Sequence, residues 1–172
     1  IEESLAKSLR DESQDFQYDY NIHSSEHSLE VQIPFIQTFS KTAKIVPVLI
    51  SDVKYAKSLA QALYKHLRGR SACVIVSTDL SHYHPDSTAR DIDQKTQNAF
   101  QKLSPTFFRE AYEKGEIELC GAAAVLTLLE LNALYGQGEY KNLNYATSGN
   151  NIHDKSSVVG YNASLISTSN EI

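Results

Sequence analysis

An acid and an imidazole follow the most apolar β-branched run of the chain. Val74, Ile75 and Val76 predict a buried strand, and Asp79 and His82 come shortly after its end. Ligands of open α/β sheets bind at the carboxyl ends of strands, so we expect both side chains to face a cleft. We predict that His82 is a catalytic acid or base and that Asp79 orients it or holds a charge. The alternative is a histidine held by hydrogen bonds within its loop.

A second polar cluster, Glu26-His27-Ser28-Leu29-Glu30, lies upstream. We predict that Glu26 and His27 bind substrate at the same composite site. The pattern also suits a helix start, in which Ser28 caps the helix and Glu30 lies near its positive end.

A third cluster is the loop at 148–154, which is rich in residues that form turns and expose backbone amides. We predict that Asn150 and Asn151 contact substrate there, and His153 lies in the same loop. The alternative is a loop that only connects two strands. Histidines and carboxylates of the three clusters could together form the ligand shell of a non-haem iron, copper or zinc ion.

Composition limits what this site can serve. The 172 residues are 41% hydrophobic and 22% charged, which fits one globular domain over 1–172. The net charge of -5 and the lack of a basic run argue against nucleic acid as a partner, and no apolar stretch is long enough to span a membrane. No signal peptide opens the chain, so we expect a cytoplasmic protein whose partner is a small molecule or a peptide. Cys73 and Cys120 have no metal-binding spacing; we expect Cys73 to be buried, whereas Cys120 is either buried or a helix-start thiol of lowered pKa.

Hydrophobic periodicity alternates between helix and strand along the chain. Helices are predicted near 2–9, 27–39, 55–67, 86–103, 104–115 and 122–135. Strands are predicted at 45–50, 74–76, 143–147 and 158–166. This order predicts an α/β fold with a central, mainly parallel or mixed sheet flanked by helices.

Six short motifs in series resemble the Memo family, which includes the proteins called AmmeMemoRadiSam system protein B. They are Glu26-His27-Ser28-Leu29-Glu30 with Ile33-Pro34-Phe35, Ile45-Val46-Pro47-Val48-Leu49, Ser77-Thr78-Asp79-Leu80-Ser81-His82, Cys120-Gly121, Asn144-Tyr145-Ala146-Thr147-Ser148-Gly149 and Ser156-Ser157-Val158-Val159-Gly160-Tyr161.

The resemblance implies a fold like that of the class III extradiol ring-cleavage dioxygenases. It places His82 at the family's acid/base histidine with Asp79 beside it, and Glu26 and His27 at the other cleft motif. Family members are longer at the amino terminus, where they carry metal-ligating histidines, so we expect this chain to be the C-terminal part of a longer Memo-like domain. Some members have a cysteine where this chain has Asn150-Asn151-Ile152.

Three functional hypotheses follow. The first is a metal-dependent oxidoreductase of dioxygenase ancestry, with iron or copper as cofactor and His82 moving protons. The second is a module that binds a peptide or small ligand in the same cleft without turnover. The third is a structural piece that completes a larger assembly. A shared fold does not transfer the reaction, and the sequence leaves the substrate and the oligomeric state open.

Overall fold

The computed structural model describes residues 1–136 and 138–168, in which three strands form one sheet. They are β1 (His82–His84), β2 (Glu139–Thr147) and β3 (Val158–Ser167), with β3 in the centre. Both pairings are antiparallel. The described sheet therefore differs from the mainly parallel or mixed sheet that we expected, although the α/β class is confirmed.

Helices account for most of the remaining regular structure and lie close to the predicted positions, except that the helix at Tyr20–Ser24 was not predicted and that the helix expected from His27 begins at Ile33 after a 3-10 turn. They are α1 (Glu3–Arg10), α2 (Tyr20–Ser24), α3 (Ile33–Phe39), α4 (Ala56–Leu67), α5 (Asp86–Gln101), α6 (Pro105–Glu113) and α7 (Ala122–Leu134), with 3-10 turns at Glu30–Gln32, Val53–Tyr55 and Ser148–Asn150. Local signals explain several boundaries. Ser104 caps α6 by accepting a hydrogen bond from the Phe107 amide, and Pro105 occupies the first turn.

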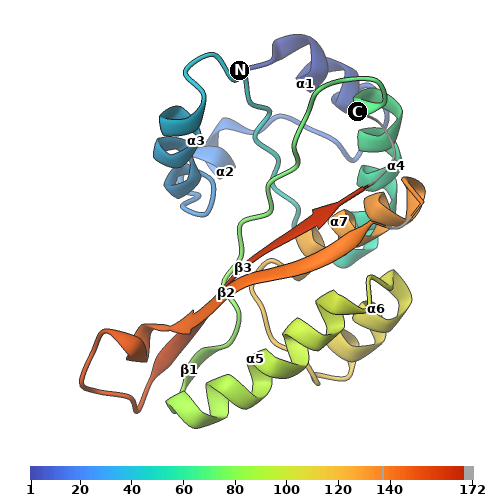
Figure 1. Cartoon of the computed structure of the whole chain (residues 1–172). Helices are drawn as coiled ribbons and strands as arrows, with labels where there is room; N and C mark the ends of the chain where they lie inside the picture. The colour runs from blue at the N-terminus through green and yellow to red at the C-terminus, as the bar shows by residue number, and fades with distance from the viewer. Residues whose placement is uncertain (137, 169–172) are drawn as a thin grey trace.

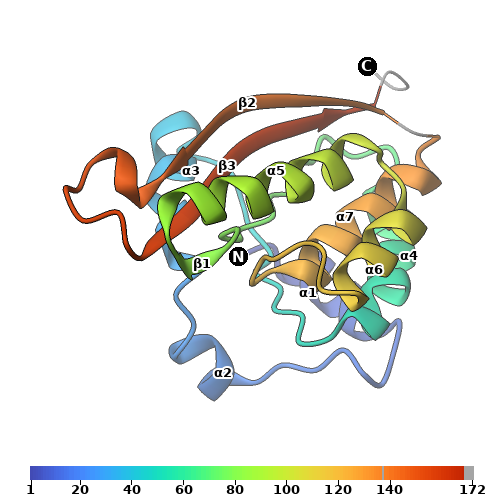
Figure 2. The same ribbon diagram turned by 90° about the horizontal axis from the view of Figure 1, so that it is seen from below.

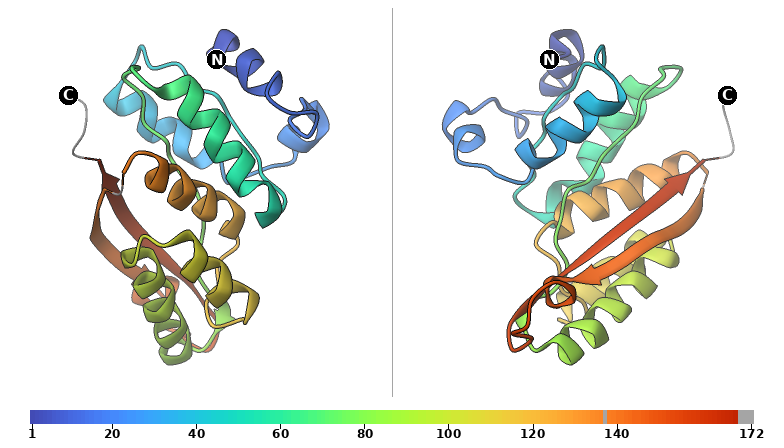
Figure 3. Two further views of the ribbon diagram at one scale, coloured as in Figure 1. Left: turned by 90° about the vertical axis from the view of Figure 1, so that its right-hand side faces the viewer. Right: turned by 60° about the vertical axis from the view of Figure 1, so that its left-hand side comes forward.

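The β2–β3 hairpin lies over α5, as seen from below in Figure 2. Helix α7 packs between α4 and α6, and its nearly uniform apolar composition suits this buried position. The core is formed by α5, α6 and α7 together with Leu80, Ile117 and Leu119. Figure 3 shows α1, α2 and α3 at the end of the molecule away from the hairpin tip.

The two expected strands at 45–50 and 74–76 are extended segments without ladder pairing. Figure 1 shows both running through the molecule as plain coil. The Ile45 carbonyl accepts a hydrogen bond from the Glu2 amide, but none of the backbone bonds of the described residues joins 72–78 to a neighbouring strand. A strand needs a partner as well as an extended conformation, and the β-branched runs specify only the conformation.

This lack of pairing also corrects the prediction for Cys73. The segment around it is not enclosed by a sheet, and Cys73 is exposed rather than buried. Among the described residues, no helix is long and apolar enough to cross a membrane.

Candidate functional site

The structure brings Asp79 and His82 together. His82 Nε2 lies 3.5 Å from Asp79 Oδ2, which is an ion-pair distance and longer than a good N–H···O hydrogen bond. The side chains are 26% exposed for His82 and 46% for Asp79, so both can meet a ligand from solvent. A carboxylate beside an imidazole is the arrangement expected of an acid–base pair.

The backbone between these two residues is fixed against β3. The Leu80 amide donates to the Gly160 carbonyl at 2.9 Å, and the Gly160 amide donates to the Ser81 carbonyl at 2.9 Å. His82 then pairs with Val159. These bonds hold the two residues between Asp79 and His82 against β3, so the sheet fixes the backbone from which both side chains project.

A buried carboxylate under the sheet supports the same loop. Asp93 of α5 is fully buried; its Oδ1 accepts from the Ser81 amide at 2.9 Å and its Oδ2 from the Tyr145 hydroxyl at 2.7 Å. Burial, followed by the hydrogen bond to Asp93, raises the pKa of Tyr145, so the phenol stays protonated as a donor. Gly160 makes room for this carboxylate, because a Cβ there would overlap it.

Glu118 holds the other side of His82. Its Oε1 accepts from the His82 amide at 2.9 Å and its Oε2 lies 2.8 Å from His84 Nε2. Burial works against the charge, but these two contacts outweigh it and lower the pKa of Glu118. Between the two histidines, Tyr83 bulges out of β1 with φ of 62°.

Cys120 lies directly before α7 and contacts the other end of the loop. Its Sγ accepts from the Asp79 amide at 3.2 Å, and its own amide donates to the Asp79 carbonyl at 3.3 Å. The thiol is exposed, not buried. Thr78 completes this junction by accepting a hydrogen bond from the Gly121 amide at 2.7 Å.

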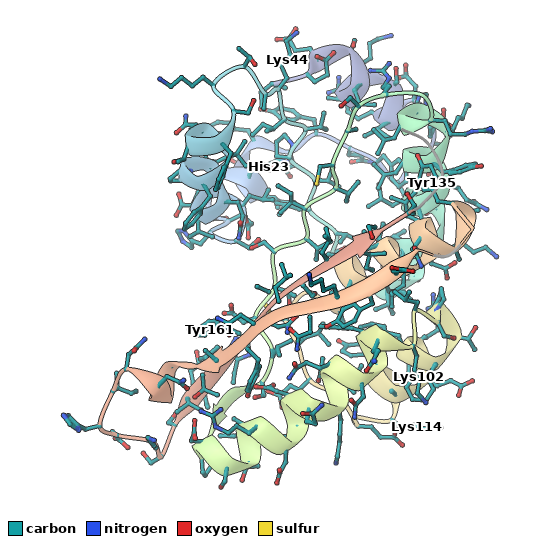
Figure 4. The ribbon with its side chains drawn as sticks, viewed as in Figure 1. His23, Lys44, Lys102, Lys114, Tyr135 and Tyr161 are labelled. Atoms are coloured by element: carbon teal, nitrogen blue, oxygen red, sulfur yellow. The ribbon has the colours of Figure 1, made fainter. Side chains whose placement is uncertain are left out.

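Tyr161 belongs to the same face of the sheet as His82. Val158 and Gly160 are buried on the side of the sheet that faces α5. Because side chains alternate along a strand, Val159 and Tyr161 lie on the outer face. His82 pairs with Val159 and therefore shares that face. Figure 4 shows Tyr161 on the hairpin near the point where β3 approaches β1. Burial, and then the negative charge of Asp79, raise the pKa of Tyr161. The charge of Asp79 therefore acts on the phenol of Tyr161.

His27 and Glu26 are engaged mainly with their own segment. His27 is 82% exposed and its Nδ1 lies 2.9 Å from Glu30 Oε1, a contact that raises the pKa of His27. Glu26 accepts from the amides of Ser28 at 2.6 Å and Leu29 at 2.9 Å. Burial opposes the charge of Glu26, but these bonds outweigh it and lower its pKa. Glu26 itself therefore caps the turn in which we expected Ser28 to be the cap.

One hydrogen bond ties the segment after His27 to the loop that leads to Asp79. Gln32 Nε2 donates to Ser77 Oγ at 3.1 Å. No hydrogen bond or ion pair joins Glu26 or His27 to Asp79 or His82 within 1–136 and 138–168. A single composite site that includes His27 remains a prediction.

Asn150 has a structural role in the hairpin turn. Its Oδ1 accepts from the Arg90 guanidinium at 2.8 Å and from the Thr147 amide at 3.2 Å. Asn151 ends the 3-10 turn, and its amide donates to the Ser148 carbonyl at 3.2 Å. Neither amide side chain makes a hydrogen bond to the Asp79–His82 pair in the described structure, and substrate binding by these residues also remains a prediction.

Asp79 and His82 by themselves do not make up the ligand shell of a metal ion. In the part of the chain that the structure describes, no group of three or more His, Cys, Asp or Glu side chains could hold a metal ion. Two surface hollows lie elsewhere, one between α5 and β2 and the other between the end of α1 and α4. With 26% and 46% of their side chains exposed, His82 and Asp79 stand on a face that is open to solvent.

Three residues of this face were not predicted from the sequence. Glu118 lies far from His82 in sequence, two residues before Cys120, and no sequence signal linked it to the site. Tyr83 directly follows His82, and Tyr161 ends the last of the six motifs, but neither showed its role without the register of β1 on β3.

Comparison with known proteins gives a consistent result. A family model described as "Memo-like protein" matches residues 1–165. A "MEMO1 family protein" of Methanobrevibacter smithii is 35% identical over 165 residues, which cover 94% of this chain and 58% of the relative. Relatives described in the same words are 38% identical in Sulfolobus acidocaldarius (83% of this chain, 52% of the relative) and 34% identical in Thermotoga petrophila (96% and 60%). The chain thus spans little more than half the length of these relatives.

Proposed function

Because this chain belongs to the Memo family, we propose that Asp79 and His82 form its proton-transfer pair and act on an ionisable hydroxyl group of a small ligand. The observation that carries the proposal is the 3.5 Å approach of His82 Nε2 to Asp79 Oδ2 on a loop held by β3, Asp93 and Glu118. In the step proposed, the ligand O–H bond breaks and its proton moves to the imidazole. Asp79 stabilises the imidazolium that forms.

An oxidoreductase of dioxygenase ancestry remains the reaction class that we propose for the complete site. The ligand hydroxyl must lose its proton before a phenolic or enolic substrate is oxidised, and His82 is placed for that step. Iron or copper would find two protein donors here, fewer than the three protein ligands typical of catalytic metal sites. The proposal therefore assigns to Asp79 and His82 the proton transfer alone, and it assigns no oxidation step to the described residues.

The test uses 4-nitrocatechol, whose absorbance changes when its hydroxyl groups lose protons. We expect the protein to shift the bound probe toward the deprotonated form, His82→Asn to abolish the shift and Asp79→Asn to reduce it. A matched control is His66→Asn, since His66 also pairs with a carboxylate, Glu12, at 2.6 Å and is 21% exposed. Equal loss in His66→Asn and His82→Asn would overturn the proposal.

The open face favours a second candidate, a binding module without turnover. Both side chains of the pair are partly exposed, and an exposed pair can contact the side chain of a peptide. In this case 4-nitrocatechol would bind with its spectrum unchanged, and His82→Asn would weaken binding only.

A further inference from the structure

Tyr83 combines two unfavourable features beside the proposed site. Its φ of 62° lies in the left-handed region, which is uncommon for residues other than glycine, asparagine and aspartate. Its side chain is 77% exposed, so burial does not compensate for that backbone conformation. Backbone outliers that the fold maintains at such a place are typical of functional sites.

The surrounding contacts enforce this conformation. His82 pairs with Val159 and His84 with Val158, which makes Tyr83 the extra residue of a β-bulge. Glu118 spans the bulge, because it binds the amide of His82 and the ring of His84. These contacts therefore hold the bulge from both sides, while the ring of Tyr83 is exposed to solvent.

The ring of Tyr83 lies next to the imidazole that the proposed function uses. The two ring centroids are 5.6 Å apart and the planes are inclined by 54°. Two inclined rings form a corner, and a third planar ring that enters it can stack on one and meet the edge of the other.

We propose that Tyr83 is a ligand-contacting residue that selects planar, conjugated ligands for the Asp79–His82 pair. This inference rests on the proposed function, because it places the ligand at His82. The ligand class is one whose hydroxyl-bearing ring is flat, since a puckered aliphatic ring would not fill the corner between Tyr83 and His82.

The experiment measures the affinity of 4-nitrocatechol for Tyr83 variants by NMR titration. Tyr83→Asn removes the ring and tolerates the left-handed conformation, and we expect it to weaken binding about tenfold, as loss of one stacking contact would. Tyr83→Phe keeps the ring and should bind within about twofold of the wild type on the same basis. Tyr20→Asn is the control, because Tyr20 is an exposed tyrosine of α2.

A direct signature accompanies the titration. The ring protons of Tyr83 should shift upfield when the probe stacks on them, and those of Tyr20 should not. Wild-type affinity in Tyr83→Asn, with the absorbance shift of the probe still lost in His82→Asn, would overturn the role of Tyr83 and leave the proposed function standing. Binding that depends on neither residue would overturn both.

Discussion

At most positions a protein with alanine is more stable than the same protein with glycine. The left-handed conformation of Tyr83 predicts the opposite order at this position. Replacing Tyr83 by Ala or by Gly removes the same ring, so any energy that the exposed ring contributes cancels in the comparison. Alanine at φ near 62° keeps a penalty of about 1–2 kcal/mol, which glycine does not have. Glycine loses about 0.5–1 kcal/mol more backbone entropy on folding. Tyr83→Gly should therefore be more stable than Tyr83→Ala by roughly 0.7 kcal/mol.

Urea unfolding of the two variants measures this difference. The control pair is Leu165→Gly and Leu165→Ala, because Leu165 is an exposed residue of β3 that pairs with Lys141 in the ladder. There the alanine variant should be the more stable by about 0.5–1 kcal/mol. If Tyr83→Gly is less stable than Tyr83→Ala by as much as at the control position, the bulge does not exist in solution and the argument for Tyr83 fails.

Three further predictions concern the support of the pair. Gly160→Ala should destabilise the fold by about 1–3 kcal/mol in urea unfolding, because its Cβ would overlap the buried Asp93 carboxylate; a change below about 0.5 kcal/mol would contradict this packing. The lowered pKa of Glu118 means that its contribution to stability is present above pH 4.5 and is lost as the pH falls through its folded value. The stability difference between the wild type and Glu118→Gln should therefore shrink below pH 4.5, and a pH-independent difference would refute the contacts of Glu118. Asp79→Asn should lower the pKa of Tyr161, measured by NMR of ring-labelled tyrosine, but leave it above its ordinary value because burial is the larger cause; no change would place Tyr161 away from Asp79.

Helices could be predicted well because their signals are local. The apolar run of α7 and the Ser104-Pro105 start of α6 each carry their structure within one segment. The strands were harder, since pairing depends on residues far away in the chain. Val74–Val76 has the composition of a strand but remains unpaired in the described structure, and β1 forms at His82–His84, which has no alternating apolar pattern.

The contacts of the candidate site divide in the same way, into local ones that the sequence predicts and long-range ones that depend on the fold. Asp79 and His82 are three residues apart, so their proximity could be predicted from the loop that contains them. Glu118 reaches His82 across 36 positions of sequence, and that contact required the fold. For His27, the local alternative accounts for the contacts observed, because its ring pairs with Glu30 in its own turn.

A double-mutant cycle on Asp79 and His82, with deprotonation of bound 4-nitrocatechol as the readout, tests the pair most directly. We expect strong coupling between the two substitutions, because residues that act as one unit lose their effect together. Asp79→Asn should then have almost no further effect in a protein that already carries His82→Asn. Equal effects of Asp79→Asn in the presence and absence of His82 would show that the two side chains act independently, and would contradict the pair.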